Sequence, residues 1–423
     1  MNRRAIFFIL ILFTYSVCIA SIELKITMSS DEQSKKLVQD VSNSIFSLAP
    51  ENVRVVIEMD GMARTVNEKV DVEERFIMNF FATYDATKNV YSANWSESER
   101  IVYSCTYSPK EERPYREFVR ECAHYPLERA ALKLLSKNRF KKYLRVTYHP
   151  SVDEYTSFSP DGKLFAFITD RLGGNRNVAL LNLMEGTIRV LPVHGSSEYF
   201  PKFSPDNSRI AFQGSLHGFW NIYVMPIDDH AKNIVLISSG SAPAYAPAWF
   251  DANTLVYIQD TEGGNAMIRA TLTRRRSRVN IEGFDMVFSP TVHAGTIYFV
   301  GLKEANFGIY ALTPEGNVVC VEDSFYNEHD PAVSPDGRYL AYSCNALGYY
   351  AIWIKDLQTG EKWCLTEELK QDAFYPSFSP NGQIVAFSAS EGFFEPDIWF
   401  VRFFKPSDSG VQSSPPSTGS PQR

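Results

Sequence analysis

The tetrapeptide Ser159-Pro160-Asp161-Gly162 recurs along this chain at a fixed step and decides its fold. It returns at 204–207, 334–337 and 379–382, and degenerate copies lie at 249–252 and 288–290. A step of 45 residues separates Ser159 from Ser204, and the same step separates Ser334 from Ser379. Repeats of about 40–45 residues are typical of propellers, in which each repeat folds into a four-stranded blade.

Short strand-like runs surround each copy. In the first repeat an aromatic residue, Phe158, precedes the turn; apolar runs follow at 164–168 and 178–183, and a fourth run lies at 187–191. The turn residues suit a tight reversal, because proline fixes φ, aspartate binds the backbone and glycine accepts a positive φ. One such unit leaves apolar surface uncovered, so the six copies are expected to stack on one another.

The number of strands predicts how the array ends. The sixth copy stops near residue 404 without a fourth strand, and a strand-like run at 143–147 precedes the first copy. Pairing that early run with the last repeat closes a ring and leaves no exposed sheet edge. The sequence therefore predicts a mainly β fold, a six-bladed β-propeller over residues 141–404 with 143–147 as the closing strand of the last blade. An open solenoid is the alternative.

The segments beside the repeats differ from them. Residues 21–140 alternate strand and helix patterns: a strand at 22–26, a helix at 37–48 after a Ser30/Gln33 capping box, a strand at 53–57, a hairpin formed by 76–84 and 90–95, and a second helix beginning at Pro126. This order predicts a small N-terminal α/β domain. Residues 405–423 are rich in serine and proline and predict a disordered tail.

The first twenty residues have the layout of a secretory signal peptide. Arg3 and Arg4 precede an apolar run at 5–13, and Cys18-Ile19-Ala20 provides small residues for cleavage before Ser21. A membrane anchor and a lipid-modified Cys18 are the alternatives. No later apolar run is long enough to span a bilayer. The mature protein is thus expected to be soluble and exported, without a membrane span.

Composition and motifs argue against several classes of function. The 423-residue chain has a net charge of −7, which disfavours general nucleic-acid binding. The motifs G-x-S-x-G, H-E-x-x-H and G-x-x-x-x-G-K-[ST] do not occur, so we predict a non-enzyme without cofactor or metal. Cys105 and Cys122 lie close in sequence, and either a disulfide or two buried thiols fits them.

The loops opposite the Ser-Pro-Asp-Gly turns are the predicted partner-binding site, and we call this side of the ring the loop face. Most blades place an acid and an aromatic side chain there, and aromatic residues often anchor protein interfaces. The alternative is that the aromatics only pack between blades. The predicted residues are Asp153, Tyr155, Arg171, Glu198, Tyr199, His217, Tyr245, Glu262, Asp285, Lys303, His329, Asp330, Asp372, Tyr375 and Glu391.

Three stretches resemble the TolB family, the exported propeller proteins of the Tol–Pal system of Gram-negative bacteria. The repeat from Phe158 to Arg171 is similar to the family's blade motif. More specific are Arg120-Glu121-Cys122-Ala123-His124, Leu135-Ser136, Phe140 and Leu144-Arg145-Val146, which resemble the family's junction between its α/β domain and its propeller. Asp40-Val41, Ser44 and Phe46 resemble its first helix imperfectly.

The resemblance implies a non-enzymatic, monomeric adaptor located in the periplasm. It implies that one propeller face binds a Pal-like peptidoglycan-associated lipoprotein. It also implies contact with a TolA-like inner-membrane protein through an N-terminal segment, here Ser21, Ile22, Glu23, Leu24, Lys25 and Ile26. Such a protein supports outer-membrane invagination and integrity during division. The alternatives are an exported propeller hydrolase or peptidase, and a ligand-binding propeller.

Overall fold

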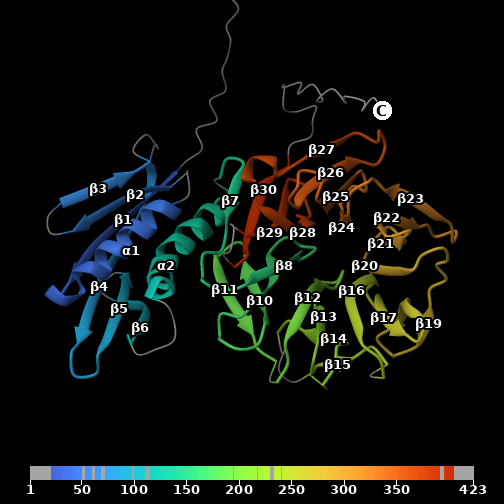
Figure 1. Cartoon of the computed structure of the whole chain (residues 1–423), viewed down its shortest axis with the longest axis horizontal. Helices are drawn as coiled ribbons and strands as arrows, with labels where there is room; N and C mark the ends of the chain where they lie inside the picture. Colours follow the sequence, from blue (N-terminus) through green and yellow to red (C-terminus); the bar gives the residue numbers. More distant parts are fainter. Residues whose placement is uncertain are drawn as a thin grey trace, which may run out of the picture.

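The computed structural model describes residues 21–49, 53–59, 62–67, 72–97, 100–109, 115–138, 140–193, 195–216, 218–228, 233–239, 241–390 and 395–403. These residues form a six-stranded sheet with two α-helices, followed by a ring of six four-stranded sheets (Figure 1). The predicted fold class, a six-bladed propeller after a small α/β region, is confirmed. The predicted signal peptide and tail lie outside the described residues. Within the described residues, no helix is both long and apolar enough to cross a membrane.

One sheet and two helices make up the α/β domain. The sheet has the order β3-β2-β1-β4-β5-β6, and β1 runs parallel to both of its neighbours. Alternate residues of β1, namely Leu24, Ile26 and Met28, are buried in the core that the helices share. The elements are β1 (Ser21–Ser30), η1 (Glu32–Ser34), α1 (Lys35–Leu48), β2 (Val53–Met59), β3 (Met62–Val66), β4 (Val72–Asp85), β5 (Val90–Glu97), β6 (Arg100–Tyr107) and α2 (Tyr115–Ser136).

Two details of this domain correct the predictions. Helix α2 begins at Tyr115 and contains Pro126 in its interior, whereas we expected Pro126 to start it. Phe118 and Cys122, in the first half of the helix, are fully buried, and that burial offsets the hydrogen bond that proline removes. The helical segment that follows β1 is capped by Asp31 and not by Ser30, because the Asp31 carboxylate accepts a 2.8 Å hydrogen bond from the Ser34 N–H.

The predicted N-terminal partner segment, residues 21–26, lies inside this sheet. It forms the first part of β1, which is paired with β2 on one side and with β4 on the other. The Glu23 side chain is 5% exposed and forms ion pairs with Arg54 and Arg75. A strand paired on both edges has no free backbone groups for another chain, so this segment can offer a partner only its side chains, and the predicted contact stays a prediction.

Each blade of the ring is a four-stranded antiparallel meander. Blade one contains β8 (Asp153–Phe158), β9 (Leu164–Thr169), β10 (Asn177–Asn182) and β11 (Thr187–Leu191); blade two, β12 (Glu198–Phe203), β13 (Arg209–Gly214), β14 (Asn221–Pro226) and β15 (Val235–Leu236); blade three, β16 (Ala244–Asp251), β17 (Thr254–Thr261), β18 (Gly264–Thr271) and β19 (Arg276–Arg278). Blade four contains β20 (Met286–His293), β21 (Thr296–Lys303), β22 (Asn306–Leu312) and β23 (Val318–Glu322); blade five, β24 (Glu328–Val333), β25 (Tyr339–Cys344), β26 (Ala351–Asp356) and β27 (Lys362–Cys364); blade six, β28 (Asp372–Phe378), β29 (Ile384–Ser390), β30 (Asp397–Arg402) and β7 (Tyr143–Arg145), with η2 (Glu367–Leu369) before β28.

The repeated tetrapeptide forms the turn between the first two strands of a blade. The Ser159 hydroxyl donates to Asp161 (2.8 Å) and accepts from the Leu164 N–H (2.8 Å), while Gly162 adopts a φ of +70°. In blades three and four, which lack the motif, the first two strands are longer and are joined by a shorter turn. There Asp251 pairs directly with Thr254, and His293 pairs with Thr296, which leaves no room for the serine-centred loop.

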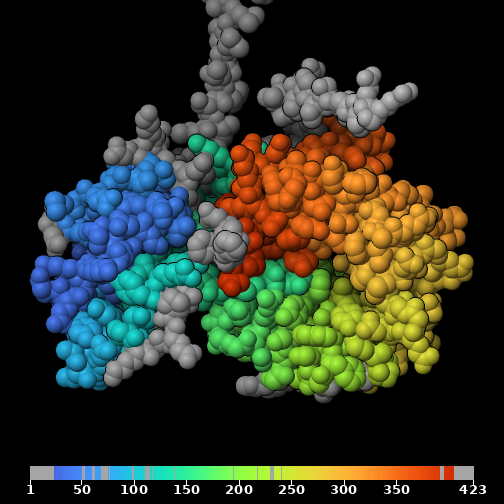
Figure 2. Space-filling view, viewed as in Figure 1, coloured from blue at the N-terminus to red at the C-terminus, as the bar shows by residue number. Residues whose placement is uncertain are grey.

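The ring closes where the strand count required it. Strand β7 pairs with β30, so the first strand after the α/β domain completes the last blade (Figure 1, teal beside red). Helix α2 then packs across blades one and six, and Leu127, Leu144 and Phe400 belong to one continuous apolar cluster. Figure 2 shows the α/β domain in contact with these two blades. The two domains therefore share a core.

Gly186 lies where blade one meets α2. A methyl group added at this position is expected to destabilise the folded protein. The φ of Gly186 is +65°, and an added Cβ would lie 3.1 Å from the Leu132 carbonyl oxygen of α2. Gly360 occupies the same turn in blade five, with a φ of +78° and no atom within 4 Å of such a Cβ. We expect Gly186→Ala to lower the free energy of unfolding by about 1–2 kcal/mol more than Gly360→Ala, measured by urea denaturation. Equal losses of stability in the two variants would show that the close approach of α2 to this turn has no energetic effect.

Candidate functional site

A β-bulge interrupts the innermost strand of every blade and turns one residue toward the axis of the ring. The six bulge residues all have a positive φ, and in five blades a proline, which has no N–H to donate to the ladder, follows directly. Bulges re-aim side chains, and here they deliver one from each blade to the channel. The bulge residues are Tyr155, Phe200, Ala246, Ser289, Asp330 and Tyr375.

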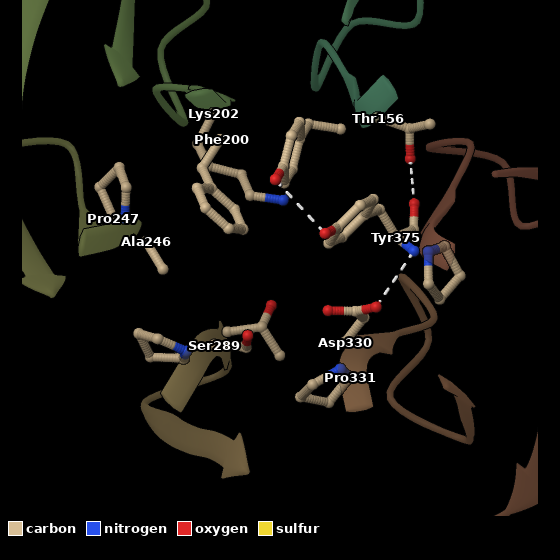
Figure 3. A pocket seen from close by; sticks show the side chains of 13 residues that line it. Thr156, Phe200, Lys202, Ala246, Pro247, Ser289, Asp330, Pro331 and Tyr375 are labelled. Carbon is tan, nitrogen blue, oxygen red and sulfur yellow. Dashed lines mark hydrogen bonds between the residues drawn. The ribbon is translucent and has the colours of Figure 1, made fainter. Parts of the chain in front are cut away.

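These residues enclose a cavity of about 40 Å³ on the axis (Figure 3). Such a volume holds a few water molecules or a small polar group. The ammonium group of Lys202 points into it, and no hydrogen bond or ion pair of that group is formed with the described residues. Burial lowers the pKa of Lys202, and the attraction of Asp330 opposes this effect.

Asp330 supplies the acid of the channel. Its carboxylate accepts hydrogen bonds from the Ser343 hydroxyl (3.1 Å) and from the Tyr375 N–H (3.3 Å). Burial raises the pKa of Asp330 to about 6, because these hydrogen bonds compensate only part of the lost hydration. The Tyr375 hydroxyl donates to that of Tyr155 at 3.3 Å, and their ring centroids are 4.1 Å apart. Of the predicted residues, the structure therefore brings Tyr155, Asp330 and Tyr375 together.

Asp153 and Arg171 were predicted to bind a partner, and the structure assigns them to the domain interface instead. The Arg171 guanidinium forms two 2.8 Å hydrogen bonds to Glu128 of α2 and a 2.7 Å ion pair to Asp153. Asp153 is fully buried, and the side chains of Arg171 and Glu128 are only 10% and 12% exposed. Burial acts to raise the pKa of Glu128, but the attraction of Arg171 outweighs it and lowers that pKa to about 2. These groups hold α2 on blade one.

Glu198 is also corrected, because it is not a surface acid. It begins β12, pairs with Gly214 and is fully buried. Burial raises the pKa of its carboxyl to about 8, so the group is mainly protonated at neutral pH. The idea that blade two adds a negative charge to the loop face is therefore wrong.

The other predicted residues divide by exposure. Tyr199, Tyr245 and His329 are half-buried, with Tyr199 packed edge-on against Trp220 and Tyr245 donating a 3.0 Å hydrogen bond to Asp260. Burial lowers the pKa of His329, whose ring lies 4.9 Å from that of Phe307. His217 and Glu391 lie outside the described residues. The exposed members on the loop face are Glu262, Asp285, Lys303 and Asp372.

The predicted site did not include a group of exposed apolar side chains on the loop face. Phe325 is 95% exposed, Tyr326 45% and Leu347 36%. They project from two neighbouring loops of blade five, tied together because the Asn327 N–H donates a 3.0 Å hydrogen bond to Asn345. We call Phe325, Tyr326 and Leu347 the blade-five patch. Large apolar side chains grouped on a surface mark interaction sites.

The loops of blades one and two also carry exposed apolar side chains. Leu172 is 59% exposed and Phe219 is 40% exposed. The loop face thus presents apolar side chains around a polar channel mouth. Among the described residues, no three histidine, cysteine, aspartate or glutamate side chains are grouped as a metal site requires. The arrangement suits docking of a protein surface.

Comparison with known proteins gives an architectural likeness. No family model and no curated protein matches the chain. A putative TolB from Agrobacterium tumefaciens is 17% identical with a TM-score of 0.48, covering 60% of this chain and 92% of its own. TolB from Acinetobacter baumannii is 14% identical with a TM-score of 0.46, covering 90% and 94%. An oligogalacturonate lyase from Vibrio parahaemolyticus is 15% identical with a TM-score of 0.43, covering 63% and 94%. A fold of this kind does not by itself specify a function, which depends on the chain's own residues.

Proposed function

We propose that this protein is an exported, non-enzymatic adaptor that docks a partner protein on the loop face of its propeller. The blade-five patch carries the proposal, because Phe325 holds almost its whole ring in solvent on a surface without a covering element among the described residues. Exposed aromatic side chains at the centre of a surface are frequent anchors of protein interfaces. The rigid blades below keep such an anchor in place, which lowers the entropy cost of docking.

The partner class comes from the sequence motifs. The blade repeat and the junction motif around Arg120 resemble the TolB family, so the proposed partner on the loop face is a Pal-like lipoprotein. We propose the α/β domain for the contact with a TolA-like protein, through the open face of its sheet. Ile77 and Phe81 of β4 are 54% and 47% exposed on that face. Together these contacts would link the two membranes and support outer-membrane invagination and integrity during division.

The test measures the binding of a purified Pal-like lipoprotein domain from the same envelope to the full chain. We expect Phe325→Ala combined with Leu347→Ala to weaken binding about 30-fold or more, because the pair removes the apolar anchor. Met184→Ala combined with Val319→Ala is the matched control, since these side chains are 69% and 49% exposed away from the loop face. Equal effects of the two pairs, or no binding by the unmodified chain, would contradict the proposal.

A ligand-binding propeller is the second candidate, and the channel favours it over an exported hydrolase or peptidase. Lys202 offers a cation without a partner among the described residues, inside a small cavity that aromatic rings surround. Lys202→Met separates the two candidates in the same experiment. An adaptor retains its partner when Lys202 is replaced, whereas a small anionic ligand of the channel loses its binding site.

A further inference from the structure

Two cysteine side chains meet inside the α/β domain. Cys105 lies on the edge strand β6 and Cys122 lies on α2, and their Sγ atoms are 3.1 Å apart. Cys105 is 6% exposed and Cys122 is fully buried. The sequence left open whether these residues are bonded to each other or are two buried thiols.

Contacts on both sides of the sulfur pair hold strand and helix together. The Tyr103 hydroxyl donates a 3.0 Å hydrogen bond to the Glu121 carboxylate, and the Tyr107 ring stacks on Phe118 at 5.2 Å. Both contacts join β6 to α2, and along β6 they lie on either side of Cys105. The Trp95 indole N–H also donates a 2.8 Å hydrogen bond to the Cys122 carbonyl oxygen. The two sulfur atoms are thus positioned before any bond forms.

We propose that Cys105 and Cys122 form a disulfide in the exported protein. A disulfide has an S–S distance of about 2.05 Å, so the two sulfur atoms, 3.1 Å apart, must approach by about 1 Å to form the bond. The other three cysteines among the described residues are arranged differently. Cys344 contacts the Glu328 carboxylate (3.8 Å), Cys364 contacts the Ile352 carbonyl (3.7 Å) and Cys320 is exposed on the outermost strand of blade four.

The bond requires a disulfide-containing oxidant, either a small disulfide or an oxidoreductase of the exported compartment. The Cys105 thiolate attacks a sulfur of that disulfide and displaces one donor thiolate. The Cys122 thiolate then attacks the Cys105 sulfur and displaces the second donor thiolate. Two protons leave the protein and two electrons pass to the donor, which becomes a dithiol. Cys105 reacts first because it is the more exposed of the two and lies on an edge strand.

The bond would connect the sheet covalently to the helix that carries Glu128 to the propeller. The disulfide restricts the unfolded chain and stabilises the domain, as disulfides do in exported domains with small cores. It also prevents β6 from separating from α2. Its formation does not depend on the adaptor function, since it concerns a different part of the molecule.

The experiment equilibrates the full chain with oxidised and reduced glutathione, alkylates it under denaturing conditions and maps the labelled peptides. We expect Cys105 and Cys122 to be unlabelled and joined in one linked peptide, while Cys320, Cys344 and Cys364 carry the label. Labelling of both Cys105 and Cys122 in full, or linkage of either to another cysteine, would overturn the proposal. This readout uses the unmodified protein and depends on no variant.

A second measurement tests the effect on stability. Reductant should lower the melting temperature of the unmodified chain by several degrees. The double variant Cys105→Ser/Cys122→Ser should melt at the same temperature with and without reductant. Cys344→Ser is the control and should keep the response of the unmodified chain. A response to reductant that persists in the double variant would assign the effect to another pair.

Discussion

Arg171→Ala is expected to lower the free energy of unfolding by about 3–5 kcal/mol, which is a large part of the stability of an ordinary domain. The substitution removes the only cation that contacts both Glu128 and Asp153 among the described residues. Two carboxylates then lie buried and close together without the cation that compensates their charge. Because Glu128 belongs to α2, the effect should appear as loosening of the α/β domain from blade one. Urea denaturation and limited proteolysis between residues 136 and 153 measure it.

Lys163→Ala is the matched control for this prediction. Lys163 belongs to the same blade and pairs with Asp161 at 3.5 Å, but its side chain is 72% exposed. Exposed pairs contribute little to stability, so a change within about 0.5 kcal/mol is expected. If Arg171→Ala and Lys163→Ala destabilise the protein equally, the proposed clamp does not hold the domains together.

Glu198→Gln is expected to stabilise the protein at alkaline pH by about 4 kcal/mol and to change little at pH 5. The pKa of Glu198 in the folded protein is about 8, against an ordinary value of 4.5. Between these values the folded state binds a proton that the unfolded state releases, so stability falls as the pH rises through this window and is lowest above 8. Each pKa unit corresponds to about 1.36 kcal/mol. Glutamine remains neutral and avoids this loss.

The measurement compares the urea midpoints of the variant and the unmodified chain at pH 5 and pH 9. Glu262→Gln is the control, because Glu262 is exposed on the loop face of blade three and its replacement should have no pH-dependent effect. A gain from Glu198→Gln that is equal at both pH values would mean that the carboxyl is not protonated in the folded protein.

Local sequence rules predicted the propeller well, because each blade is built from contacts between residues close in sequence. Ser159, Asp161 and Gly162 encode their turn by themselves, through one hydroxyl, one carboxylate and one positive φ. The beginning of α2 was predicted wrongly for the opposite reason. Pro126 indicates a helix start by local rules, but burial of Phe118 against the sheet favours a helix that already begins at Tyr115, before the proline.

The candidate site was predicted only in part. The residues predicted from the sequence include three that line the channel, Tyr155, Asp330 and Tyr375, because the acids and aromatics expected on this face include bulge residues. The sequence did not distinguish exposed acids from Asp153 and Glu198, since both begin a strand as Asp372 does. Their burial depends on neighbours from other blades and from α2. The exposure of Phe325 has the same origin, because only the assembled ring shows which loops remain uncovered.

The sequence by itself determined the repeat, its turns, the number of blades and the strand that closes the ring. These follow from periodicity and from turn chemistry, which act within a few residues. Only the tertiary structure decided that Arg171 holds Glu128, that β1 is a central strand, that Glu198 is buried and that Cys105 meets Cys122. Each of these depends on burial and on distances between segments far apart in the chain. Residue type alone does not specify them, since the same side chain gains or loses its charge and its partners with the packing around it.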